Sequence, residues 1–201
     1  AGLFQSAWVI TNIYLGLILR TMGTDFFPRL SALSNENGKI KKLVNEQSYI
    51  VLIIASPLIM GMLMFSETAI SIFYSSDFVY ADGVVRWQIA GTFFKVLAWP
   101  IAFIMLAKNK GFLFLLTEII FYAVYLRASY LMFSRIGLAA YGVGYMIAYV
   151  IYLPVVYLIG RFISGFRWNK EVAPMICLLC TSPSPRARQT ARMPSSACKQ
   201  K

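Results

Sequence analysis

The segment Met-Gly-Thr-Asp-Phe-Phe-Pro-Arg-Leu-Ser, residues 22–31, and the polar run that follows it to Gln47 separate two long apolar stretches. Residues 1–19 and 47–66 contain no charged side chain. The polar segment between them carries Arg29, Lys39, Lys41 and Lys42. A connection rich in Lys and Arg between apolar segments is typical of the cytoplasmic side of a membrane protein. The segment therefore predicts a turn between two membrane spans.

The composition supports a membrane protein. The 201 residues are 59% hydrophobic and 13% charged, with a mean hydropathy of +0.65, whereas a soluble domain carries about 25% charged residues. A helix needs roughly 20 apolar residues to cross a bilayer. We therefore expect an all-α, polytopic membrane helix bundle. Its about five transmembrane helices are predicted near residues 3–19, 48–65, 84–107, 112–133 and 138–159.

Basic residues predict the orientation of these spans. The connections at residues 20–47 and 108–110 and the segment after residue 160 are rich in Lys and Arg, and the connections between them are poor. Cytoplasmic loops carry the excess of basic residues. The N-terminus is therefore expected outside, with loop 20–47 and residues 161–176 in the cytoplasm. Without the five basic residues after Thr181, the formal charge falls from +11 to +6 (14 basic against 8 acidic residues), and that excess lies mostly in loops. No basic patch on a soluble face indicates nucleic acid as a partner.

Glycine and proline predict local breaks. Gly23 and Pro28 are expected to end the first helix, and residues 35–38 are expected to form a turn. Small residues recur at near four-residue spacing in the last span, where they would let helices approach closely. They are Gly137, Ala140, Gly144 and Ala148.

The end of the chain differs from the rest. Residues 177–201 are rich in Pro, Ser and Arg, and resemble translated sequencing-adapter read-through; a native disordered basic tail is the alternative. We expect residues 1–176 to form a partial transmembrane lobe and residues 177–201 a non-native or disordered tail. Because the chain opens at Ala1 inside an apolar run, we expect a C-terminal fragment of a longer protein.

Four charged residues lie inside predicted spans: Arg86, near the end of its span, and three candidate site residues, Lys95, Glu118 and Arg127. Lys95 is close to the bilayer midplane, and Glu118 lies at comparable depth. Charges at this depth are costly and usually face a cavity, a substrate or a counter-charge. Lys95 and Glu118 therefore form either a structural ion pair or a cavity-lining, coupling site. Arg127 either extends to the membrane surface or binds an anion.

Catalytic patterns are missing from the sequence. It contains no His, no phosphate-binding Gly-rich loop with Lys, no pattern of metal ligands and only three Cys, all after residue 176. We therefore expect no enzyme activity and no metal.

The quoted motif resembles those of the bacterial O-antigen/oligosaccharide flippases, in the multidrug/oligosaccharidyl-lipid/polysaccharide exporter superfamily. The resemblance rests on residues 2–8 (Gly-Leu-Phe-Gln-Ser-Ala-Trp), on residues 22–31 with Asp25, Pro28 and Arg29, and on residues 44–47 (Val-Asn-Glu-Gln). It extends to about Trp168. It implies that the helices form most of the second lobe of a two-lobed exporter.

The resemblance also implies a function. A flippase of this family moves a polyprenyl-diphosphate-linked oligosaccharide from the cytoplasmic to the outer leaflet of the bacterial inner membrane by alternating access. Lys95 and, less directly, Arg127 would bind the diphosphate, and Glu118 would pair with Lys95 or take up a coupling proton. No cofactor is implied beyond a proton or sodium gradient. The implied partners are the lipid-linked oligosaccharide, the membrane, a polysaccharide polymerase and a chain-length regulator.

Other interpretations remain open. A peptidoglycan-precursor flippase or a multidrug/cation antiporter of the same superfamily has similar sequence features. A membrane-embedded polysaccharide polymerase or ligase needs a sizeable outer loop with catalytic groups, whereas the outer connections predicted here are short and lack His.

Overall fold

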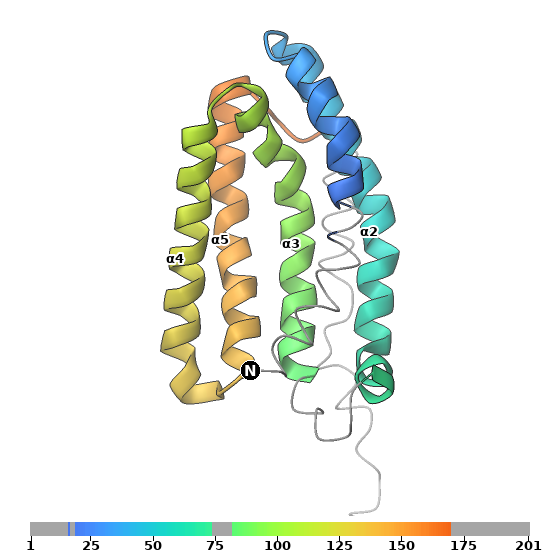
Figure 1. The fold of residues 1–201 in the computed structure, drawn as a ribbon, viewed down its shortest axis with the longest axis vertical. Coiled ribbons are helices and arrows are strands. Elements are labelled where there is room, and N and C mark those ends of the chain that lie inside the picture. The colour runs from blue at the N-terminus through green and yellow to red at the C-terminus, as the bar shows by residue number, and fades with distance from the viewer. Residues whose placement is uncertain (1–15, 17–18, 74–81, 170–201) are drawn as a thin grey trace, which may run out of the picture. The chain divides into compact units, whose positions relative to one another are not determined.

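The chain forms a bundle of long helices (Figure 1). The structure, a computed structural model, describes residues 16, 19–73 and 82–169. Residues 19–32 are helical. The long helices that follow are α2 (Asn37–Phe73), α3 (Asp82–Ala107), α4 (Gly111–Ile136) and α5 (Ala139–Ser164). No strand occurs within those described ranges. The predicted all-α class is therefore confirmed.

Four stretches of these helices are long and apolar enough to cross a membrane. They are Asn37–Gly61, Arg86–Ala107, Gly111–Ile136 and Ala139–Ser164. They correspond to four of the five predicted spans, so the chain is a multi-pass membrane protein. The other predicted span, residues 3–19, lies almost entirely outside the described residues. The predicted tail at 177–201 also lies outside them.

The helix α2 begins before the span that the sequence predicts at residues 48–65. Ion pairs at helical spacing lie at its start, between Lys39 and Glu36, which directly precedes the helix, at 2.8 Å and between Lys42 and Glu46 at 3.9 Å. Side chains three or four residues apart are neighbours on a helix surface and stabilise it modestly. The polar run after Asn37 is therefore a helical extension of the span rather than a loop.

The predicted break at Gly23 and Pro28 is wrong, because residues 19–32 are continuously helical. Pro28 lies on the exposed side, where the carbonyl that loses its amide partner can face solvent. Phe26 and Leu30 are buried on the opposite side. Tertiary packing therefore overrides the local preference of these residues. The helix ends in turns at residues 33–35, close to the predicted turn at 35–38.

The helix α3 lies at the centre of the packing. It contacts α2 on one side and α5 on the other, and α4 packs mainly on α5 (Figure 1). Side chains from α3 dominate the fully buried set, including Ile101, Ile104 and Met105. Phe26 in the helical stretch 19–32 packs on Trp99 and Phe103, with ring centroids 6.0 Å from each.

Small residues bring α5 close to its neighbours, as the sequence predicts for Ala140, Gly144 and Ala148, which are all buried. A Cβ atom built on Gly144 would overlap the Oγ of Ser129 in α4. Gly137 differs from the prediction. It has a positive φ of 57° and no neighbour within 4 Å of a built Cβ. Gly137 therefore ends α4 rather than packing a helix interface, since only glycine adopts such a φ without strain.

Candidate functional site

Lys95 lies near the middle of α3. The residue is half-buried, nine positions after Arg86 and twelve before Ala107. At about 1.5 Å per residue its Cα is roughly 14 Å from one end of this span and 18 Å from the other. The structure therefore places a basic side chain deep within an apolar helix.

Glu118 enters the same interior from α4. Its Oε1 accepts a hydrogen bond of 2.7 Å from the Tyr152 hydroxyl of α5. Lys95 lies within electrostatic range of Glu118. The three residues come from three helices, and α5 lies between the other two. The structure thus brings Lys95 and Glu118 into one site, with a tyrosine that sequence analysis did not select.

A row of tyrosines on α5 extends from this site. Tyr145, Tyr149 and Tyr152 repeat at four- and three-residue spacing, so they share one helix face. Their ring centroids are 4.8 Å apart for Tyr145–Tyr149 and 5.8 Å for Tyr149–Tyr152. Phe121 of α4 packs against Tyr149 at 4.5 Å. These tyrosines were not selected from the sequence. Their spacing indicates one shared helix face but not whether that face lies in the interior.

Polar side chains of α3 continue the site. Gln88, Thr92 and Lys95 repeat at four- and three-residue spacing along α3. Gln88 is 1% exposed, and neither its amide nitrogen nor its amide oxygen has a hydrogen-bond partner among the described residues. Thr92 donates its hydroxyl to the Gln88 carbonyl at 2.8 Å. The face of α3 that carries Lys95 is therefore polar over several turns.

Arg127 does not join Lys95 and Glu118. It lies nine residues after Glu118 on α4, and that spacing places the two on opposite helix faces. Arg127 is exposed, on a helix whose outer side also exposes Leu126, Tyr130 and Leu131. The structure therefore gives Arg127 no part in the interior site. Its role as an anion-binding residue stays a prediction.

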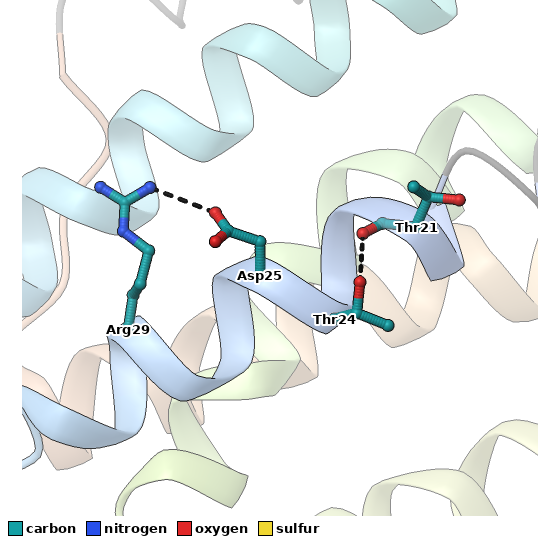
Figure 2. Close-up of polar contacts among 4 residues, drawn as sticks. All are labelled: Thr21, Thr24, Asp25 and Arg29. Carbon is teal, nitrogen blue, oxygen red and sulfur yellow. Dashed lines mark hydrogen bonds and ion pairs between the residues drawn. The ribbon is translucent and has the colours of Figure 1, made fainter.

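The motif residues Asp25, Pro28 and Arg29 lie on the exposed side of the helical stretch 19–32. Figure 2 shows the Arg29 guanidinium turned toward the Asp25 carboxylate, at 3.3 Å. Thr24, on the same helix, donates its hydroxyl to the Thr21 carbonyl at 2.7 Å (Figure 2). These motif residues therefore lie on the opposite side of the stretch from the buried Phe26 and Leu30.

We expect Asp25→Asn to change stability little. The side chains of Arg29 and Asp25 are 63% and 76% exposed, and an exposed ion pair contributes less than about 0.5 kcal/mol at such spacing on a helix. Thermal unfolding in detergent, followed by tryptophan fluorescence, should show nearly the same midpoint as the unsubstituted protein. A fall of several degrees would show that Asp25 has a contact beyond Arg29.

Basic residues gather at one end of the bundle. The start of α2, the α3–α4 turn and the end of α5 meet there (Figure 1). Lys108 donates to Asn37 Oδ1 at 2.6 Å, and Asn45 donates to the Arg167 carbonyl at 3.1 Å. Basic side chains at this end include Lys39, Lys41, Lys42, Lys108, Lys110 and Arg161. Lys and Arg residues from segments that are separate in the sequence therefore lie together at one end of the bundle.

No group of three or more metal-ligating side chains occurs within the part of the chain that the structure describes. The site consists instead of a lysine, a carboxylate and hydroxyl groups on apolar helices. These groups can donate and accept hydrogen bonds and exchange protons.

Comparison with known proteins finds one family match and two curated relatives. Residues 1–81 match the family described as "Polysaccharide biosynthesis protein". The chain is also 22% identical over 151 residues to the "Lipid III flippase" of Escherichia coli K12, and equally so to that of Shigella flexneri. Each alignment covers 75% of this chain and 36% of the relative.

The chain thus spans little more than a third of the length of these curated relatives. No solved structure matches it. Both comparisons support the flippase/exporter superfamily, and the curated relatives are named as flippases rather than as enzymes. The chain is therefore similar to a polysaccharide biosynthesis family and to curated proteins named as lipid III flippases.

Proposed function

We propose that the protein moves a polyprenyl-diphosphate-linked oligosaccharide from the cytoplasmic to the outer leaflet of the bacterial inner membrane. The product would supply the synthesis of O-antigen or a related surface polysaccharide. The family match over residues 1–81 and the similarity to flippases support a lipid-linked substrate. The described helices would then form most of one lobe of a two-lobed exporter.

Lys95 carries this proposal. A lysine at the centre of a span costs about 2.5–3.5 kcal/mol on insertion scales, and this cost is offset when the ammonium meets an anion. A diphosphate supplies that anion at the junction of lipid and sugar. The polar face formed by Gln88, Thr92 and Lys95 would offer hydrogen bonds to the same substrate. An apolar drug would need neither feature.

Transport would follow alternating access. Rocking of one helix bundle against another around a central site is the usual mechanism of such carriers. When the site is empty, Glu118 partly neutralises the field of Lys95 across the interior. When the diphosphate binds, its negative charge would neutralise Lys95 in place of Glu118. A proton or sodium gradient would drive the cycle, with Glu118 as the coupling carboxylate.

The basic end of the bundle would face the cytoplasm. Loop 20–47 and residues 161–176 would then be cytoplasmic and the N-terminus outside. A polysaccharide polymerase and a chain-length regulator would receive the product on the outer side. Arg127, on the exposed side of α4, would bind anions only if another part of the transporter covers it.

We expect cysteine labelling to show this orientation. Cys177, Cys180 and Cys198 are first replaced by Ser, and single cysteines are introduced at the exposed positions Ser31 and Ser134. A membrane-impermeant maleimide added to intact cells should label Ser134→Cys strongly. It should label Ser31→Cys only after the inner membrane is opened. The reverse pattern would contradict the proposed orientation.

The function is tested by complementation. The reading frame that contains this chain is expressed in a bacterial strain that lacks its O-antigen flippase, and surface polysaccharide is measured on gels and by antibody. Restored polysaccharide supports the proposal. Normal expression in the membrane without any restoration, across several strains with different repeat sugars, would contradict it.

A multidrug/cation antiporter of the same superfamily is the second candidate. The Glu118 carboxylate within an apolar helix favours the antiporter, because a carboxylate can bind a cationic substrate. Lys95, within electrostatic range, opposes it. Expression in a drug-sensitive strain distinguishes the two, since an antiporter raises resistance to cationic dyes whereas an oligosaccharide flippase leaves it unchanged.

A further inference from the structure

Basic side chains gather where the start of α2 meets the end of α5 (Figure 1). The Lys41 Nζ lies 3.1 Å from a Cβ built on Gly165, the residue that caps α5. Four residues further along α2, Asn45 donates to the Arg167 carbonyl at 3.1 Å. Arg161 lies one turn before Gly165, whose N–H donates to the Arg161 carbonyl at 2.8 Å. Lys41, Arg161 and Arg167 therefore lie at one junction, the α2–α5 basic surface.

The α2–α5 basic surface lacks the carboxylates that neutralise other lysines at this end of the bundle. Glu36 pairs with Lys39 and Glu46 with Lys42. No ion pair joins a side chain of the α2–α5 basic surface to a carboxylate of the described residues. The two arginines of this surface are exposed and its lysine is half-buried. Positive charges at one junction repel one another, and a bound anion relieves that repulsion.

This surface lies at the level where the membrane spans end. The span Ala139–Ser164 ends three residues after Arg161, and the span Asn37–Gly61 begins four residues before Lys41. At about 1.5 Å per residue, both basic residues therefore lie within roughly 6 Å of an end of their span. The polar head groups of the lipids occupy the zone just outside the hydrocarbon core. The basic side chains can therefore reach head groups directly.

Exposed apolar side chains adjoin the basic ones on α5. Phe162 is 93% exposed and Leu158 is 61% exposed. Leu158 lies three residues before Arg161 and four before Phe162, so the three side chains share one side of the helix. An anionic phospholipid is complementary to this arrangement, because it carries a negative head group on apolar chains. A soluble phosphate would contact the cations alone.

We propose that the α2–α5 basic surface binds the head group of an anionic phospholipid. Arg161 and Arg167 contact the lipid phosphate, and Phe162 contacts the acyl chains. Lys41 adds positive charge at the same junction, beside the negative end of the α5 helix dipole. The lipid would join the end of α5 to the start of α2. The inference is independent of the transported substrate, because this surface lies at the end of the spans and Lys95 lies near the middle of one.

The test measures lipid binding by native mass spectrometry. The protein in a neutral detergent is mixed with equal amounts of phosphatidylglycerol, which is anionic, and of phosphatidylcholine with the same acyl chains, which has no net charge. The variants are Arg161→Gln/Arg167→Gln and Arg161→Lys/Arg167→Lys. Arg135→Gln is the matched control, because Arg135 is an exposed arginine in the last turn of α4, at the other end of the bundle.

We expect the unsubstituted protein to prefer phosphatidylglycerol, and Arg161→Gln/Arg167→Gln to bind it roughly tenfold more weakly, because each basic side chain near anionic lipid contributes about fivefold in affinity. Arg161→Lys/Arg167→Lys should retain most of the binding, since lysine keeps the charge. Arg135→Gln should bind as the unsubstituted protein does. Added salt should reduce the preference for phosphatidylglycerol. Equal binding of the two lipids by the unsubstituted protein, or equal losses in Arg161→Gln/Arg167→Gln and Arg135→Gln, would overturn the inference.

A second measurement separates a lipid from a soluble anion. Glycerol phosphate carries a similar anionic group without acyl chains, so we expect even a large excess of it to leave phosphatidylglycerol bound. Phe162→Ser should weaken phosphatidylglycerol binding several-fold, because it removes apolar area that the acyl chains cover. Displacement of the lipid by an equal concentration of glycerol phosphate, together with unchanged binding in Phe162→Ser, would show a soluble-anion site and overturn the assignment to a lipid.

Discussion

Lys95→Ala is expected to abolish export of surface polysaccharide in the complementation strain while the protein stays in the membrane at normal levels. The substitution removes the positive charge that sits near the middle of α3. It should not harm folding, because an apolar residue at mid-span is favoured over a lysine by about 2.5–3.5 kcal/mol. Surface polysaccharide is measured on gels, and membrane abundance by immunoblot.

Lys95→Arg is the matched control for this prediction. The guanidinium keeps the charge and binds phosphate well, although its geometry differs from that of an ammonium. We expect partial export from Lys95→Arg and none from Lys95→Glu. Normal polysaccharide from Lys95→Ala would contradict the role of Lys95 in binding the diphosphate.

Gly144→Val is expected to destabilise the protein by about 3 kcal/mol, near the upper end of the range for overpacked cores. A Cβ at this position would overlap the Ser129 Oγ and approach the Ser129 backbone nitrogen to 3.1 Å. The valine therefore forces α4 and α5 apart along the face that carries Glu118 and Tyr152. The loss is measured by unfolding in mixed detergent micelles, with tryptophan fluorescence as the signal.

The smaller substitution Gly144→Ala tests the cause of this loss. Its overlap with the Ser129 Oγ should be partly relieved by Ser129→Ala, so the two substitutions together should cost less than their separate sum. Gly38→Ala is the control, because nothing lies within 4 Å of a Cβ built there. It should be neutral or slightly stabilising, since alanine favours the helix. Equal losses from Gly144→Val and Gly38→Ala would contradict the close α4–α5 contact.

The helical spans were predictable because long uncharged runs leave few alternatives in a membrane. The predictions at Gly23, Pro28 and Gly137 failed for a different reason. At Gly23 and Pro28, the burial of neighbouring Phe26 maintains the helix, and burial depends on partners that are distant in sequence. At Gly137, position in a regular four-residue series suggested packing, but the helix ends there.

The candidate site was predictable only in part. Lys95 and Glu118 stood out because a charge within an apolar run is costly whatever its partners are. Tyr152 did not stand out, because a tyrosine suits both a membrane interface and a buried interior. The choice between them depends on how α4 and α5 are aligned, and sequence spacing within one helix does not fix that alignment.

The most direct test of the account is a leaflet assay. The product of the reading frame that contains this chain is reconstituted in vesicles with a fluorescent oligosaccharide on a short polyprenyl diphosphate. A glycosidase outside the vesicles reports how much lipid reaches the outer leaflet. The account predicts rapid and nearly complete accessibility with the unsubstituted protein, and with Lys95→Ala only the slow rate of protein-free vesicles. Equal rates for the unsubstituted protein and protein-free vesicles, with the protein folded and correctly inserted, would contradict it.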